Sequence, residues 1–312
     1  MPSKSATSRA SKTSRKAAIG KQAATGKATA AKSKTGKLPE WSLADLYGGI
    51  DASEVARDLQ QMDADCVAFE SDYKGKLAEG VAREDGGHWL AEAVRRYEAI
   101  DDLAGRLGSY AGLVHAGDSV DPAISKFYGD VSERLTAASV HLLFFGLELN
   151  RVDDAAIERA METPELGHYR PWIEDLRKDK PYQLEDRVEQ LFLDQSQSGY
   201  AAWNRLFDET MSELKFTVDG EDLSLEPTLN LMQHPDEAKR KAGAEALAAT
   251  FKKNLRLFAL ITNTLAKDKD ISDKWRGFKD IADARHLSNR VEPEVVTALV
   301  DAVQRAYPKL SH

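Results

Sequence analysis

The seven histidines are the residues of this chain best suited to metal chemistry. They are His88, His115, His141, His168, His234, His286 and His312. A zinc-binding helix of the His-Glu-x-x-His type needs two imidazoles four residues apart with a glutamate beside them, so that both rings and the carboxylate face one metal-bound water. No two of these histidines lie four apart, and none is followed by glutamate. The spacing therefore predicts structural histidines and no metal ligands.

The other reactive residue types are also predicted to be structural. Cys66 is the single cysteine, which rules out an internal disulfide, and its place on an apolar stripe indicates a small core residue. No glycine spacing suits a phosphate-binding loop or a Gly-x-Ser-x-Gly nucleophile turn. The chain contains several pairs of adjacent acidic residues: Asp101/Asp102, Asp153/Asp154 and Glu174/Asp175. In so acidic a chain, such pairs are typical of solvent-exposed helix faces. We therefore predict no catalytic, cofactor-binding or metal-binding residue here.

Apolar residues recur every three to four positions along most of the chain, which predicts one helix after another. One stripe runs from Val55 to Tyr73, and a second from Leu90 to about Val114. A third helix is expected to begin at Asp121-Pro122 and to continue through Phe145 as a single helix of about 30 residues. Further helices are expected over 154–161, 169–176, 184–193, 201–214, 236–265 and 293–307.

One short segment breaks the helical pattern. Residues 214–218 alternate apolar and polar, and Asp219-Gly220 follows, which favours a two-residue type I′ turn. That turn pairs Phe216 with Leu223 and Leu214 with Leu225, all on one side of the ribbon. The fold class predicted for the chain is all-α with one small β-hairpin near 214–225.

The charge of the chain is divided unevenly. Residues 1–37 hold ten basic residues and no acidic one, so the remainder carries 33 basic against 51 acidic residues, a net charge of −18. Because 1–37 is also poor in large apolar residues, we expect a disordered basic tail followed by a folded region, 38–312. A solvated tail, an organellar transit peptide and a nucleic-acid-binding arm are all compatible with its composition. The acidic body itself excludes a nucleic-acid platform, and no apolar run is long enough to span a membrane.

Several short segments of 38–312 occur in a recognisable order. They are Pro39-Glu40-Trp41-Ser42-Leu43-Ala44-Asp45-Leu46-Tyr47, Tyr73-Lys74-Gly75-Lys76-Leu77, Leu176–Leu184 with Glu189, Ala202-Trp203-Asn204-Arg205-Leu206, Trp275-Arg276-Gly277-Phe278 and Asn289-Arg290-Val291. Together they resemble the N-terminal half of the oligoendopeptidase F family, zinc metallopeptidases of the thimet-oligopeptidase-like clan. The resemblance implies the helical N-terminal part of an oligopeptidase fold, with oligopeptides as substrates and a cytoplasmic location.

The family resemblance also implies a cofactor. Full-length members hold zinc through two histidines of a His-Glu-x-x-His helix and a more distant glutamate, and the zinc-bound water attacks the peptide carbonyl. The motif does not occur in this chain, so none of these ligands is carried over. We therefore expect a peptidase truncated before its catalytic region, with no bound zinc and no activity alone, whose partner is a complementary catalytic half.

Two alternatives to this interpretation remain. The chain could instead be a non-catalytic helical interaction module whose basic tail binds polyanions. Its location could be organellar rather than cytoplasmic if 1–37 is a transit peptide.

Overall fold

The computed structural model describes residues 41–310. The chain divides into two units, Met1–Ser42 and Leu43–His312, and of the first only Trp41 and Ser42 are described. The predicted tail, 1–37, and the predicted boundary at Leu38 therefore lie outside the described residues. Within 41–310, no helix combines the length and the apolar character needed to cross a membrane.

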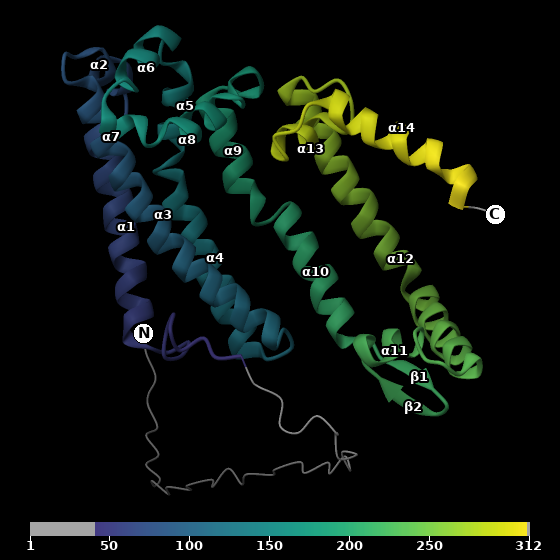
Figure 1. The fold of residues 1–312 in the computed structure, drawn as a ribbon. Coiled ribbons are helices and arrows are strands. Elements are labelled where there is room, and N and C mark those ends of the chain that lie inside the picture. The colour runs from purple at the N-terminus through teal and green to yellow at the C-terminus, as the bar shows by residue number, and fades with distance from the viewer. Residues whose placement is uncertain (1–40, 311–312) are drawn as a thin grey trace, which may run out of the picture. The chain divides into compact units, whose positions relative to one another are not determined.

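The second unit begins with a helical bundle, shown in purple and blue in Figure 1. Its elements are α1 (Ser53–Tyr73), α2 (Leu77–Ala82), α3 (Gly86–Gly117) and α4 (Pro122–Val140). The apolar stripe predicted for the first helix is buried, because residues at this spacing share one face of a helix. Its buried residues are Val55, Leu59, Met62, Cys66, Phe69 and Tyr73. These side chains form one core with α3 and α4, which confirms the helical interpretation of this part.

The helix expected from Pro122 to Phe145 is divided in two, so that expectation is wrong. Helix α4 ends at Val140, and α5 runs from Leu143 to Arg151. At the break, the His141 and Leu142 amides bond to carbonyls three residues back, which tightens the last turn. The imidazole of His141 contacts the Glu70 carboxylate of α1, and Glu148 of α5 accepts a hydrogen bond from the Gly75 amide. These tertiary contacts favour two separate helices, although the continuous apolar period alone would favour a single one.

The start of α4 follows the predicted capping pattern, which gives a first testable result. Asp121 accepts hydrogen bonds from the amides of Ala123 (2.7 Å) and Ile124 (3.2 Å), with proline at the first helical position. We expect Asp121→Ala to lower the free energy of unfolding by about 1 kcal/mol, because two amides lose their acceptor. Urea denaturation measures the change. Glu133→Ala, an exposed change on the same helix, is the control, and an equal effect of both variants would contradict the capping role.

Shorter elements connect this bundle to the rest of the unit. In chain order they are α6 (Asp154–Ala160), α7 (Pro164–Gly167), α8 (Arg170–Arg177), the 3₁₀ turn η1 (Lys180–Tyr182), α9 (Asp186–Ser196) and α10 (Tyr200–Glu213). The sequence predicted α6, α8, α9 and α10 to within three residues at each end. It missed α2, α7 and η1, because elements of three to six residues show too little periodicity to detect.

The predicted hairpin is present, with the predicted register. Strands β1 (Phe216–Val218) and β2 (Glu221–Leu223) are antiparallel and pair Phe216 with Leu223. Asp219 and Gly220 both have positive φ, as a type I′ turn requires. The ribbon is shorter than expected, because Leu225 begins helix α11 (Leu225–Leu231) instead of pairing with Leu214. The all-α architecture with one small hairpin is thus confirmed.

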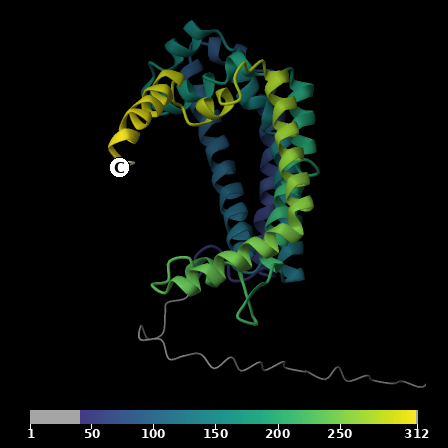
Figure 2. The ribbon, with the colours of Figure 1, turned by 90° about the vertical axis from the view of Figure 1, so that its right-hand side faces the viewer.

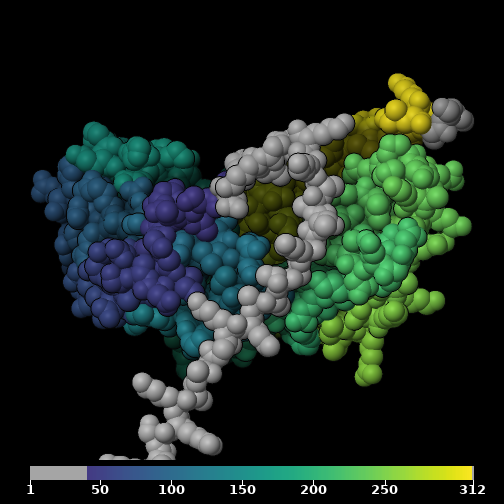
Figure 3. Space-filling model, turned by 90° about the horizontal axis from the view of Figure 1, so that it is seen from below, coloured from purple at the N-terminus to yellow at the C-terminus, as the bar shows by residue number. Residues whose placement is uncertain are grey.

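The hairpin packs on the longest helix of the chain. Helix α12 (Glu237–Arg276) is capped by Asp236 and covers the fully buried Phe216 with Ala246 and Phe251. Figure 3 shows α10–α12 and the hairpin as one green block, and Figure 2 shows α12 running beside α10. After α12 come α13 (Asp283–Ser288) and α14 (Pro293–Leu310), and no side chain of α14 is buried.

Candidate functional site

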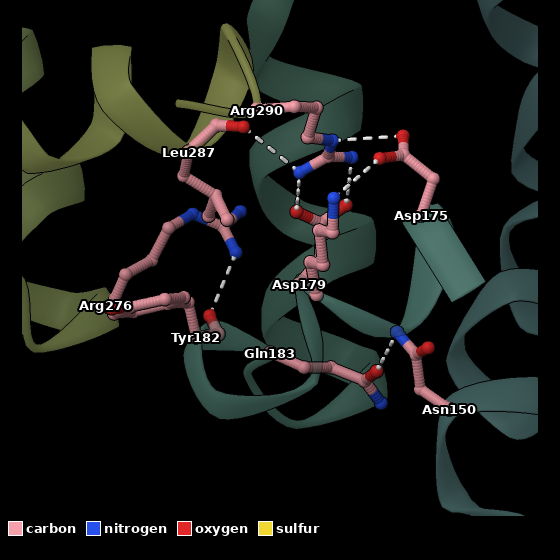
Figure 4. Close-up of polar contacts among 9 residues, drawn as sticks. Asn150, Asp175, Asp179, Tyr182, Gln183, Arg276, Leu287 and Arg290 are labelled. Carbon is pink, nitrogen blue, oxygen red and sulfur yellow. Dashed lines mark hydrogen bonds and ion pairs between the residues drawn. The ribbon is translucent and has the colours of Figure 1, made fainter. Parts of the chain in front are cut away.

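A cavity of about 650 Å³ lies between the middle of the second unit and its C-terminal part. One wall comes from α5, α8, η1 and α9, and the other from the C-terminal end of α12 and from α13. Figure 4 shows the polar side chains that join these walls. Three of the segments that carry the family resemblance converge on this cavity: 176–189, 275–278 and 289–291.

Arg276, the last residue of α12, makes the first connection across the cavity. Its two terminal nitrogens each donate to one oxygen of Glu189, at 2.8 Å and 2.8 Å, and one of them also donates to the Tyr182 carbonyl oxygen at 3.2 Å. Such a two-point fork is the strongest arrangement of guanidinium and carboxylate. Gly277 makes the turn possible, because it follows with a φ of 79° that L residues rarely adopt.

Glu189 is the buried member of this pair, with 9% of its surface exposed. Burial acts to raise its pKa, but the Arg276 guanidinium and the Leu184 amide, which donates at 2.9 Å, together hold the pKa below its usual value. The pKa of Arg276 is raised in turn, mainly by its hydrogen bonds to Glu189. Glu189 is therefore a fixed anion across the neutral pH range, and it serves as an anchor for Arg276.

Arg290, between α13 and α14, makes the second connection. Its Nε donates to Asp175 at 2.8 Å, and its terminal nitrogens donate to Asp179 at 2.8 and 3.3 Å. One of these nitrogens also donates to the Leu287 carbonyl at 3.0 Å (Figure 4). Arg290 has a φ of 51°, a left-handed conformation that costs a residue with a Cβ some energy and that these four bonds hold in place. Its hydrogen bonds to the two carboxylates, that to Asp179 first, raise the pKa of Arg290.

An aromatic contact and an amide pair complete the cavity. The rings of Tyr182 and Phe278 stack with centroids 4.2 Å apart, which joins η1 to the turn after α12. Asn150 of α5 donates through Nδ2 to Gln183 at 3.0 Å, and Gln183 donates to the Leu147 carbonyl at 3.1 Å. The Asn150 residue is only 4% exposed, and its Oδ1 has no hydrogen-bond partner among residues 41–310. This wall of the cavity thus contains one buried hydrogen-bond acceptor without a partner among the described residues, Asn150 Oδ1.

The chemistry of this arrangement is binding and positioning. Both guanidinium groups and their three carboxylates are engaged with one another, which leaves none of them poised as an acid, base or nucleophile. Among the described residues, no group of three or more His, Cys, Asp or Glu is placed to hold a metal ion. We call the Arg276–Glu189 pair and the Arg290–Asp175–Asp179 group the arginine clamp.

The histidines and acidic pairs singled out in the sequence lie apart from this cavity, with one exception. His141 contacts Glu70 at the end of α4, and His234 accepts a hydrogen bond from the Asp236 amide at the start of α12. Asp153 caps α6, while Asp154 pairs with Arg177 and Lys180. The exception is Asp175, interpreted from sequence as solvated, which belongs to the arginine clamp. No sequence signal identified it, because the family-like segment 176–184 begins one residue after Asp175.

Cys66 is buried as predicted, and this yields a second testable result. Burial chiefly, with smaller contributions from Asp63 and Asp65, raises the pKa of its thiol from 9.0 to about 11. Because the thiolate is the reactive form, we expect alkylation by iodoacetamide at pH 8 to be about a hundredfold slower in the native protein than in the unfolded one. Mass spectrometry of labelled samples with and without guanidinium chloride measures the two rates. Equal rates would show that Cys66 is accessible.

A family model described as Oligopeptidase F matches residues 148–216. Oligopeptidase PepF of Bacillus subtilis is 22% identical over 299 residues, which cover 90% of this chain and 43% of the relative. Oligoendopeptidase F homolog of Borreliella burgdorferi is 23% identical over 218 residues, 69% of this chain and 36% of the relative.

A solved structure supports the same comparison at the level of the fold. The crystal structure of oligoendopeptidase-F from Enterococcus faecium superposes with a TM-score of 0.71 at 20% sequence identity. The match covers 82% of this chain and 50% of that one. The chain therefore spans half or less of the length of the proteins it matches.

Proposed function

This chain is related to the N-terminal part of oligoendopeptidase F proteins, and from that premise we propose that it forms the helical wall of the peptide cleft in a zinc-dependent peptidase acting on short peptides. The observation that carries the proposal is the convergence of three family-like segments on one clamped cavity. Segments far apart in a sequence meet in this way when they build a shared site or hold its walls in place.

The zinc of such a peptidase does not fit the residues described here. No His-Glu-x-x-His occurs in the sequence, and residues 41–310 contain no group of side chains placed to hold a metal. We therefore route no chemical step through this chain. Its proposed contribution is to enclose the peptide and to position the cleft wall through the arginine clamp. On this proposal the zinc ligands lie in protein outside the described residues, and the chain alone is inactive.

The surface of the C-terminal helices supports a role as a scaffold for further protein. Helix α14 has no buried residue, and large apolar side chains are exposed along it, among them Val295, Leu299, Val303 and Tyr307. Two more exposed apolar side chains are Trp275 at the end of α12 and Ile281 in the turn after it. Exposed apolar side chains gathered in this way mark interaction surfaces in soluble proteins. We propose that the catalytic part of the peptidase packs against them. The same proposal places the protein in the cytoplasm.

A chimera tests this function directly. Residues 41–310 would replace the matched N-terminal part of Bacillus subtilis oligopeptidase PepF, and cleavage of a quenched fluorescent heptapeptide would be followed with and without a zinc chelator. We expect the chimera to cleave the peptide in a chelator-sensitive manner and the chain alone to show no cleavage. Cleavage by the chain alone would contradict the proposal, as would a folded chimera that binds zinc without cleaving.

The arginine clamp provides the matched control for that experiment. Arg290→Gln in the chimera removes the pairs to Asp175 and Asp179, whereas Arg187→Gln removes an exposed guanidinium that makes no ion pair with the described residues. We expect the first to raise KM several-fold and the second to leave it unchanged. Equal KM values in both would show that the clamp does not position the wall.

A further inference from the structure

A second cavity, separate from the one at the arginine clamp, lies beside Gln197 at the C-terminal end of α9. It has a volume of about 290 Å³ and lies where the end of α3 and the middle of α4 face the start of α10. Eight polar side chains line it: His115, Tyr128, Ser132, Gln197, Tyr200, Asn204, Arg205 and Asp208. They come from α3, α4, α10 and the end of α9, so the cavity depends on the tertiary fold and is not a local turn.

Most polar groups of this cavity have no protein partner. Gln197 donates to the Thr136 hydroxyl at 2.7 Å, and the other seven side chains make no hydrogen bond or ion pair with another residue in 41–310. In the cavity at the arginine clamp, by contrast, each guanidinium forms an ion pair with at least one carboxylate. Polar side chains that converge on a hollow without satisfying one another are the usual mark of a ligand site, because a ligand supplies the missing bonds.

His115 makes the strongest case for a missing partner. It lies in the last turn of α3 and is only 9% exposed, with its ring stacked on Tyr128 at 4.5 Å and an interplanar angle of 13°. The stacking fixes the ring, and its two nitrogens make no hydrogen bond with the described residues. Neither nitrogen is shielded from solvent, so a ligand in the cavity would replace water as their partner.

Arg205 and Asp208 give the ligand its charge pattern. They are three residues apart on α10, so their Cβ atoms are about 5–6 Å apart on one face of the helix. Arg205 is half-buried and unpaired, which leaves its planar fork open to a carboxylate. Asp208 offers an acceptor to a cation on the same side. A small molecule with an anionic and a cationic group close together satisfies both.

The neighbouring charges disfavour a simple anion. Arg205 also lines an adjoining cavity of about 580 Å³, whose wall carries one further cation, Lys126, and four carboxylates: Asp130, Glu133, Asp194 and Glu209. Like charges near the site raise the cost of bringing in a phosphate or another polyanion, and they favour a ligand that also carries a positive group. The volume of 290 Å³ equals that of roughly ten liquid waters, which limits the ligand to a molecule of about ten non-hydrogen atoms.

We propose that this cavity binds an amino-acid zwitterion, either a free amino acid or a dipeptide, with its carboxylate on Arg205 and its ammonium group on Asp208. His115 on α3 and Ser132 on α4 supply further hydrogen bonds, and the ring of Tyr128 supplies an apolar wall. This site is distinct from the clamped cavity, and the proposal does not depend on whether the protein takes part in peptide cleavage.

Calorimetric titration of the full chain tests the site with defined probes. The probes are alanine, Ala-Ala, N-acetyl-Ala-Ala, Ala-Ala amide and inorganic phosphate. We expect saturable binding of Ala-Ala, of alanine or of both, and the comparison of the two identifies which zwitterion fits. Each cap should weaken binding of the dipeptide at least tenfold, because it removes one of the two charges. Phosphate should not compete.

Variants assign the two charges to their partners. We expect Arg205→Gln to lower the affinity for the zwitterion at least tenfold, and to abolish the difference between the free and amidated carboxyl end. Asp208→Asn should also lower the affinity at least tenfold, and it should abolish the difference in affinity between probes with a free and with an acetylated amino end. Arg187→Gln on α9 should leave binding unchanged. Absence of saturable binding of either zwitterion, equal binding of phosphate, or an equal effect of all three variants would overturn the proposal.

Discussion

Replacing Arg276 with methionine is expected to lower the free energy of unfolding by about 3–5 kcal/mol. The change leaves the Glu189 carboxylate buried with a single remaining donor, the Leu184 amide at 2.9 Å. A buried charge that has lost its counter-ion cannot recover the hydration it gave up on folding. Urea denaturation at pH 7, followed by far-ultraviolet circular dichroism, measures the loss.

Two controls separate the ion pair from the loss of a long side chain. The double variant Arg276→Met/Glu189→Met should recover most of the stability, because no unpaired charge remains. Arg187→Met, at an exposed position, should change stability by no more than about 0.5 kcal/mol. If Arg276→Met were no more harmful than Arg187→Met, the guanidinium would not be what stabilises the buried carboxylate.

The effect of Arg276→Met should also depend on pH in a defined direction. The pKa of Glu189 is lower in the folded protein than its ordinary value of 4.5, so the pair stabilises the fold above that value. As the pH falls through the folded pKa, the carboxylate becomes protonated and the contribution disappears. The difference in stability between the native protein and Arg276→Met should therefore be full at pH 7 and should shrink in acid.

Local patterns in the sequence predicted most of the fold. The stripe from Val55 to Tyr73 is recoverable because burial in a helix follows a period that the residues themselves display. The hairpin register is recoverable because Asp219-Gly220 fixes the turn and the turn fixes the pairs. In both cases, the information lies within a few residues of the feature.

The features that sequence reasoning missed depend on contacts between distant residues. The break at His141 arises where Glu70 and Gly75 contact the α4–α5 segment from elements more than 65 positions earlier, and no local pattern displays that. The arginine clamp joins Arg276 to Glu189 across 87 positions and Arg290 to Asp179 across 111. From one sequence, each of these residues is only another charge in a chain that is rich in charges. The family resemblance identified the segments, and only the fold shows that they meet.

Phe69→Ala is the second substitution with a large expected effect, a loss of about 3–5 kcal/mol in the free energy of unfolding. The ring is fully buried, and the centroids of Tyr73, Phe145 and Phe144 lie 4.8, 5.1 and 5.8 Å from it. Its removal opens a cavity that joins α1, α3 and α5, and this aromatic cluster is too rigid to fill the space. Urea denaturation measures the loss, with the exposed Val67→Ala on the same helix as the matched control. Helix α5 also carries Asn150 and lines the cavity at the arginine clamp. A loss of the expected size would show that the bundle core helps to hold this cavity wall in place. A small effect would mean that the arginine clamp alone holds it.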